Sequence, residues 1–123
     1  MRAQPDGLPL AHAFSAPLLL NSKLVDKSFR KEAALRGKPV LVYEGGESLR
    51  LDEYAVQAGI EGTLRVMAHL DLLQGPPPAA AQPTVLLRES TWIRARKAGI
   101  FRPMVHNGEF VRRNALMGTI ADP

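Results

Sequence analysis

A chain of 123 residues, 46% of them hydrophobic, is long enough for one modest domain with a hydrophobic core. Because it contains no cysteine, a disulfide framework, a thiolate metal site and a thiol nucleophile are all excluded. The longest apolar runs, such as Ala16–Leu20, are too short to span a bilayer. We therefore expect a soluble, cytoplasmic protein without a membrane partner.

The net charge of +4 lies in the last third of the chain. Basic and acidic side chains cancel in residues 1–83, whereas residues 84–123 carry seven basic and three acidic ones. The basic residues there are Arg88, Arg94, Arg96, Lys97, Arg102, Arg112 and Arg113. They are spread through strand-like sequence with few aromatic residues between them, which favours a solvated sheet face over a nucleic-acid surface.

The first part of the chain alternates between strand and helix patterns. Pro17–Leu20 is typical of a short buried strand. Ser28–Arg36 is predicted to be a helix, with a serine at the cap position and Gly37 directly after its end. A second strand is predicted at Pro39–Tyr43, where apolar residues follow one another without alternation. Such strands belong to parallel sheets that helices cover on both faces.

A second helical region follows from Asp52. Apolar residues three or four apart continue to Leu73 and predict one buried stripe. Gly59 and Gly62 lie within this region, and glycine weakens a helix interior. We therefore expect a short helix, a break near Ile60, and a longer second helix.

The segment Gly75–Pro83 divides the chain, because four prolines in nine residues continue neither a helix nor a central strand. Residues 84–120 are predicted to be nearly all strand, with a tight turn at Asn107-Gly108. The predicted fold class is thus α/β over residues 1–74, a proline-rich linker over residues 75–83, and a small β-barrel or sandwich-like domain over residues 84–123.

The stretch around Glu44 is the candidate site. The predicted strand ends in this glutamate, and Gly45 and Gly46 follow it. Open α/β sheets place ligands at the carboxyl ends of their strands, and glycines allow a substrate or a water molecule to approach closely. A carboxylate there can take a proton from a nucleophilic water, which accelerates reactions by about a hundred- to ten-thousand-fold. The alternative is a solvated glutamate before an ordinary Gly-Gly turn.

A family resemblance favours the catalytic interpretation. The segments KPVLVYEGGE (Lys38–Glu47), Gly59-x-x-Gly62 and GIFRP (Gly99–Pro103) resemble the C-terminal half of the succinylglutamate desuccinylase/aspartoacylase family, within a similarity that covers about residues 10–123. That family consists of zinc-dependent deacylases related to zinc carboxypeptidases. The resemblance implies that residues 1–74 are the C-terminal portion of a carboxypeptidase-like catalytic domain and that the β-domain over residues 84–123 is incomplete. It also implies a parent enzyme that hydrolyses N-acyl amino acids or related amides.

The resemblance assigns a role to Glu44, which matches the general base and acid that acts on the zinc-bound water. Glu47 does not match a catalytic position. It is a weaker candidate for substrate contact, together with Gly45 and Gly46, or for capping the next helix.

The zinc ligands implied by the resemblance are missing from this sequence. The family uses a His and a Glu close together near its N-terminus and a second His farther on. This chain has no His-x-x-Glu pair, and His12, His69 and His106 fall at none of the matching positions. We therefore expect no metal site in this chain, zinc as a cofactor of the parent protein only, and no activity of this chain alone.

Two other functions remain open. GIFRPMVHNGEFVRRNALMGTI also resembles half of a biotinyl/lipoyl-type carrier domain, but Lys97, the lysine that follows the linker, has no methionine beside it. A nucleic-acid-binding piece would instead contact phosphates through its arginines, namely Arg94, Arg96, Arg112 and Arg113. We expect a small N-acyl amino acid or amide as partner and no nucleic acid, while self-association stays open.

Overall fold

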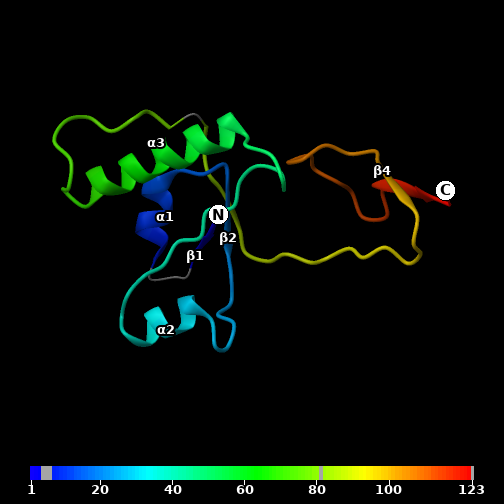
Figure 1. The fold of residues 1–123 in the computed structure, drawn as a ribbon, viewed down its shortest axis with the longest axis horizontal. Helices are drawn as coiled ribbons and strands as arrows, with labels where there is room; N and C mark the ends of the chain where they lie inside the picture. The colour runs from blue at the N-terminus through cyan, green and yellow to red at the C-terminus, as the bar shows by residue number, and fades with distance from the viewer. Residues whose placement is uncertain (4–6, 81, 123) are drawn as a thin grey trace. The chain divides into compact units, whose positions relative to one another are not determined.

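The computed structural model describes residues 1–3, 7–80 and 82–122. These residues divide into two compact units, Met1–Ser90 and Thr91–Pro123. The first unit is a small α/β structure, and the second is a β-ribbon with long connections (Figure 1). None of the helices in the described ranges is long and apolar enough to cross a membrane.

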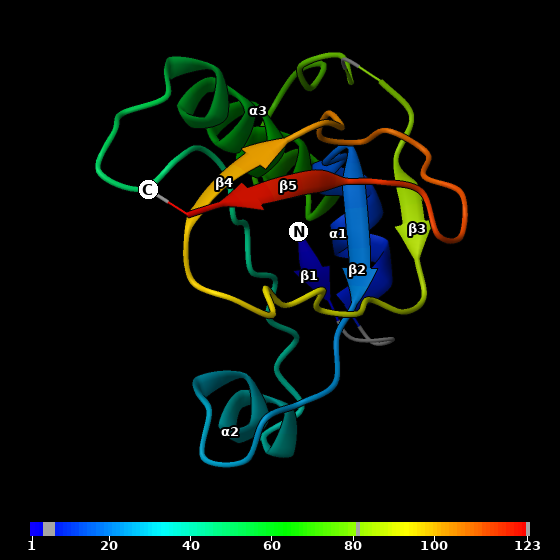
Figure 2. The same cartoon turned by 90° about the vertical axis from the view of Figure 1, so that its right-hand side faces the viewer.

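A three-stranded parallel sheet is the centre of the first unit. Its strands are β1 (Arg2–Ala3), β2 (Leu18–Asn21) and β3 (Val85–Leu87), in the order β1-β2-β3 (Figure 2). Leu19 of β2 pairs with Leu86 of β3, and Leu20 pairs with Arg2 of β1. The strand predicted at Pro17–Leu20 is therefore confirmed as β2, the central strand of the sheet.

Two helices pack together beside this sheet. They are α1 (Leu8–Phe14), which also contacts β1, and α3 (Glu53–His69). The core between sheet and helices centres on Ala11 and Leu19, which are almost wholly buried. It is small, so the first unit depends on close packing of a few side chains. The sequence prediction missed α1, whose first turn contains Pro9.

The helix predicted at Ser28–Arg36 is confirmed as α2 (Phe29–Leu35). The side chain of Ser28 accepts a hydrogen bond from the Lys31 N–H at 3.2 Å, which satisfies one of the free donors of the first turn. Gly37 follows the helix with a φ of +64°, a conformation that suits glycine. α2 has no buried residue and lies apart from α1 and α3 in both views of the chain.

The predicted break near Ile60 is wrong, because α3 is one continuous helix. Asp52 caps it and accepts a hydrogen bond from the Ala55 N–H at 3.2 Å. Its two internal glycines allow aromatic rings to approach the helix backbone. A Cβ at Gly62 would overlap the ring of Phe14, and one at Gly59 would lie 3.1 Å from Cε1 of Tyr43. These contacts outweigh the loss of about 1 kcal/mol per glycine in helix propensity.

The predicted strand at Pro39–Tyr43 is also wrong. Only Val42 makes an isolated bridge, although residues 40–42 are half-buried. Both edges of β2 are already occupied by β1 and β3, so this segment has no place beside the central strand. The segment is instead a loop, and its residue Leu41 packs against the core.

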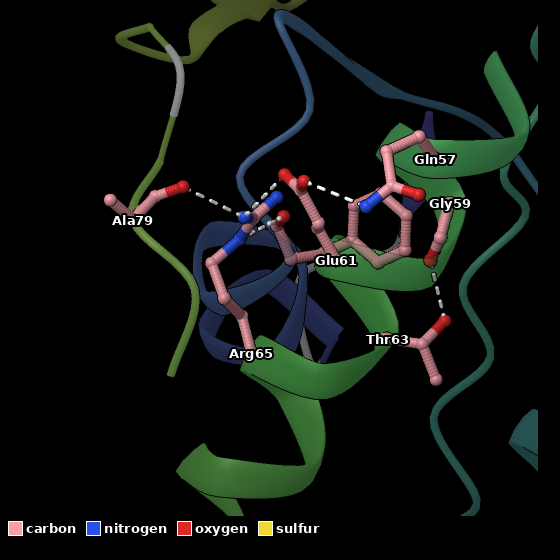
Figure 3. A network of polar contacts seen from close by, with 7 residues as sticks. Gln57, Gly59, Glu61, Thr63, Arg65 and Ala79 are labelled. Carbon is pink, nitrogen blue, oxygen red and sulfur yellow. Dashed lines mark hydrogen bonds and ion pairs between the residues drawn. The ribbon is translucent and has the colours of Figure 1, made fainter. Parts of the chain in front are cut away.

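A largely covered arginine holds the proline-rich segment against α3 (Figure 3). Arg65 of α3 donates from Nε to the Phe14 carbonyl at 3.0 Å and from Nη1 to the Ala79 carbonyl at 3.1 Å. Its side chain is only 10% exposed and lies 3.7 Å from the Glu61 carboxylate. The chain then continues into β3, which pairs with β2. The observed division after Ser90 therefore differs from the predicted domain boundary at residues 75–83.

The second unit contains one antiparallel pair, β4 (Ile100–Pro103) and β5 (Gly118–Ala121). A turn at Asn107-Gly108 lies between them, with Glu109 N–H donating to the His106 carbonyl at 3.1 Å, as the sequence predicts. Strand is much less extensive than predicted, and no residue in 91–122 is buried. Two strands do not close a barrel or a sandwich, both of which need more strands and a common core.

Candidate functional site

Glu44 lies in the connection between α2 and α3, directly after the bridge residue Val42 and Tyr43. Its side chain is exposed, rather than partly buried at the end of a strand. From there the chain passes through Gly45 and Gly46 to the cap of α3. The side chain of Glu44 is thus exposed to solvent, and the two glycines after it lead the chain to the start of α3.

Tyr43, the residue before Glu44, is fixed by contacts with both packed helices. Its hydroxyl donates a hydrogen bond to the Ala55 carbonyl of α3 at 2.9 Å. Its ring centroid lies 5.2 Å from that of Phe14 in α1, with 39° between the ring planes. Such tilted aromatic pairs stabilise beyond the area that they bury. Tyr43 therefore joins the loop to the helical layer at the position next to Glu44.

The two glycines after Glu44 are required by packing. A Cβ at Gly45 would lie 2.6 Å from the hydroxyl oxygen of Tyr43. Gly46 has a φ of +80°, and its Cβ would lie 3.2 Å from that of Asp52. The glycines thus let the loop turn tightly onto the start of α3. Whether a substrate also approaches over them stays a prediction.

Glu47 takes no part in starting the helix, so the capping alternative is wrong. The cap is Asp52, whose side chain accepts from the third residue of the helix. Glu47 instead pairs with Arg50 at 3.6 Å, and both side chains are largely exposed. An exposed pair of this kind contributes little to stability. Substrate contact by Glu47 stays a prediction.

The described residues of this chain do not form a zinc site. His12 lies in the last turn of α1, His69 in the last turn of α3, and His106 beside the turn of the second unit. Over residues 1–3, 7–80 and 82–122, no three His, Cys, Asp or Glu side chains come together as metal ligands. Catalytic zinc requires about three such ligands on one ion.

An open hollow of about 490 Å³ lies along α3, but its lining does not suit the proposed chemistry. Tyr43, Phe14, Val56 and Ile60 are among the residues that line it, and Glu44 is not. The lining is mostly apolar, with the hydroxyl groups of Tyr43 and Thr63 as its polar side-chain groups. We therefore place the candidate site at Glu44 and regard the hollow as a packing surface.

One buried donor near the carboxyl end of β2 was not foreseen from the sequence. Nη2 of Arg30 donates to Ser22 Oγ at 3.3 Å and to the Lys23 carbonyl at 3.2 Å. Its Nη1 is buried and has no acceptor among the described residues. A buried donor without a partner costs stability, so an acceptor from outside these residues would be favourable there. No local sequence pattern indicates such a site.

The ionisation of Tyr43, which is 37% exposed and otherwise packed against the two helices, provides a test of its partial burial. Burial raises the pKa of Tyr43 above 10.0, with smaller contributions from Tyr54 and Asp52. The protonated phenol is therefore favoured in the folded state. Its contribution to the free energy of unfolding is present below about pH 10 and is lost as the pH rises through the folded pKa.

We expect the free energy of unfolding of the chain to fall more steeply above about pH 10 than that of Tyr43→Phe, which cannot ionise. The measurement is urea unfolding followed by circular dichroism from about pH 9 to pH 11. Tyr54→Phe is the matched control, because Tyr54 is the other tyrosine of the chain and is 68% exposed. Tyr54→Phe should keep most of the fall in the free energy of unfolding with pH. If Tyr43→Phe shows the same fall as wild type, the partial burial of Tyr43 is contradicted.

Comparison with solved structures finds a similar fold in a known enzyme. The chain is similar to the crystal structure of a succinylglutamate desuccinylase/aspartoacylase from Rhodobacter sphaeroides, with a TM-score of 0.72 and 28% sequence identity. The similarity covers 93% of this chain and 36% of that chain. Neither the protein-family models nor the curated proteins that were searched give a match. The resemblance predicted from the sequence is confirmed, and the chain spans about a third of the length of the protein that it resembles.

Proposed function

We propose that this chain is the C-terminal portion of a deacylase that hydrolyses the amide bond of N-acyl amino acids or related compounds. The observation that carries the proposal is the structural similarity to a succinylglutamate desuccinylase/aspartoacylase over 93% of the chain. At 28% identity the likeness extends to sequence as well as fold. Because the chain corresponds to 36% of that protein, the activity belongs to a longer polypeptide.

In this proposal Glu44 is the general base and acid of the reaction. Its carboxylate takes the proton of the attacking water and then delivers it to the nitrogen of the leaving amine. One proton is accepted and one is given, so the carboxylate is regenerated at the end of the cycle. The exposed position of Glu44 leaves it accessible to a substrate, and the neighbouring Gly45 and Gly46 have no side chains to obstruct one.

Zinc is the cofactor of the parent enzyme in this proposal. It would polarise the amide carbonyl and increase the acidity of the attacking water. The histidines of this chain do not fit its site, so the ligands belong to residues outside the chain. This chain alone is expected to be inactive for that reason.

The carrier alternative gains no support from the second unit. Carriers of that type present their modified lysine at the tip of a hairpin. Lys97 precedes β4 and so lies outside the connection between β4 and β5.

The test of the proposed function is hydrolysis by the zinc-loaded, full-length polypeptide that carries this chain. The substrates are acetyl and succinyl derivatives of aspartate and glutamate, and the release of the free amino acid is measured. We expect turnover of at least one of them, and none by residues 1–123 alone. A zinc-loaded full-length protein that hydrolyses none of the four would count against the proposal.

A further inference from the structure

We propose that Tyr43 is a positioning residue for Glu44, because its side chain fixes the piece of backbone from which the catalytic carboxylate projects. The inference rests on the proposed function, in which Glu44 is the general base. It goes beyond that function by assigning catalytic importance to a residue other than the general base.

The first argument is that Tyr43 is held from several directions. Its hydroxyl is bonded to the Ala55 carbonyl in the first turn of α3. One part of its ring lies against Phe14, which is 6% exposed and belongs to the buried layer. Another part lies over the backbone of α3 at Gly59, where an added Cβ would be only 3.1 Å away. A side chain fixed at its tip and along its ring has little freedom to move.

The second argument is that the backbone around Glu44 is not held by a strand ladder. Apart from the bridge at Val42, residues 38–47 belong to no helix or strand. Consecutive Cα atoms are about 3.8 Å apart, so fixing Tyr43 restricts the Glu44 Cα directly. The anchored tyrosine thus does for Glu44 what hydrogen bonding to a neighbouring strand does in a regular sheet.

The third argument comes from Gly45. Its φ is not in the left-handed region, so its backbone conformation is open to other residues. The space where a side chain would begin is instead filled by Tyr43, with the hydroxyl oxygen at 2.6 Å and Cζ at 2.9 Å. Glycine at this position therefore accommodates the tyrosine. The residues on both sides of Glu44 form one packed unit.

General-base catalysis depends on this kind of restraint. A carboxylate must lie within hydrogen-bond reach of the proton that it removes, and displacements of about 1 Å reduce rates strongly. Loss of the Tyr43 hydroxyl bond leaves the ring in place but frees its tip. We expect this to affect the chemical step and to leave substrate binding unchanged.

The experiment compares Tyr43→Phe with wild type in the zinc-loaded, full-length polypeptide, using an N-acyl amino acid that the wild type hydrolyses. The expected result is a fall in kcat on the order of tenfold, with KM and zinc content unchanged. Tyr54→Phe is the control, because it makes the same change at a tyrosine that lies in the first turn of α3 and is 68% exposed. It should keep the wild-type kcat.

The decisive readout is the same substitution in the Glu44→Gln background. A residue that acts by positioning Glu44 has nothing left to position there, so Tyr43→Phe should cause no further loss. Gly45→Ala provides a second variant, because its methyl group displaces the tyrosine hydroxyl, and it should show the same dependence on Glu44.

Three outcomes would overturn the inference. One is an unchanged kcat in both Tyr43→Phe and Gly45→Ala while Glu44→Gln is severely impaired, which leaves the proposed function intact. Another is an equal loss from Tyr43→Phe with and without Glu44, which indicates a general structural role. The last is wild-type activity in Glu44→Gln, which removes the proposed function and this inference with it.

Discussion

Glu44→Gln should lower kcat of the proposed full-length deacylase by about a hundred- to ten-thousand-fold, the usual effect of losing a general base. The amide has the same size as the carboxylate but cannot accept the proton of the attacking water. Glu44 is exposed, so the substitution disturbs no packing and the fold should be retained. KM and zinc content should also stay near wild type, because the side chain is not a metal ligand in this proposal.

Glu47→Gln is the matched control for this variant. Glu47 carries the same charge three residues away, but it lies beyond the two glycines and pairs with Arg50 on the surface. It should cost much less activity than Glu44→Gln. The measurement is turnover of an N-acyl amino acid by both variants, with zinc quantified in each preparation. Equal activity of Glu44→Gln and wild type would mean that the stretch Leu41–Glu53 is only a turn.

Gly62→Val should lower the free energy of unfolding by about 3 kcal/mol, the upper end of the usual cost of overpacking. A Cβ at this position already overlaps the ring of Phe14, and valine adds two further methyl groups. Phe14 is 6% exposed and packs between α1 and α3, so its ring has little room to withdraw. The measurement is urea unfolding of the 123-residue chain, followed by circular dichroism.

Gly59→Val is the control, since it makes the same substitution one turn earlier in α3. There an added Cβ would lie 3.1 Å from the ring of Tyr43, whereas at Gly62 it would overlap the ring of Phe14, so less strain has to be relieved. The cost should be clearly smaller than for Gly62→Val. In addition, Phe14→Leu should recover part of the loss when combined with Gly62→Val. Equal costs at the two glycines would contradict the close contact of α1 and α3.

Local signals in the sequence predicted the elements that local interactions determine. The serine at position 28 and the glycine at position 37 delimit α2, because a cap and a left-handed glycine act within one turn. The turn at Asn107-Gly108 was predictable for the same reason. β2 was recognisable from its apolar composition, and the family resemblance came from short motifs that include Glu44.

The remaining features depend on residues far apart in the chain. The continuity of α3 depends on Phe14, which packs against Gly62 from another helix, and no propensity scale contains that contact. The segment Pro39–Tyr43 has the apolar composition of a buried strand. Whether it forms one depends on finding a strand with a free edge, which its own sequence does not indicate. The pairing of β3 with β2 could not be foreseen either. The proline segment before β3 suggested a linker to another domain, whereas a contact with Arg65 keeps that segment beside α3.

The candidate site shows the same limit. Glu44 was identified because it matches a catalytic position of the family. Gly45 and Gly46 were predicted to let a substrate approach closely. The anchoring of Tyr43 was not visible, because it joins residues 14, 43 and 55. Periodicity indicates which face of an element is buried, but it does not indicate the atom that each polar group will meet.

The position of β3 in the sequence also has a consequence for the chain during its synthesis. Leu18 pairs with Val85, so the central strand lacks its second neighbour until the intervening helices and the proline segment have been made. At roughly 5–20 residues per second, translation of that interval takes several seconds. During this time the apolar edge of β2, Leu18–Leu20, presents unpaired backbone groups to solvent or to a chaperone. The nascent chain is thus most open to aggregation before residues 85–87 emerge.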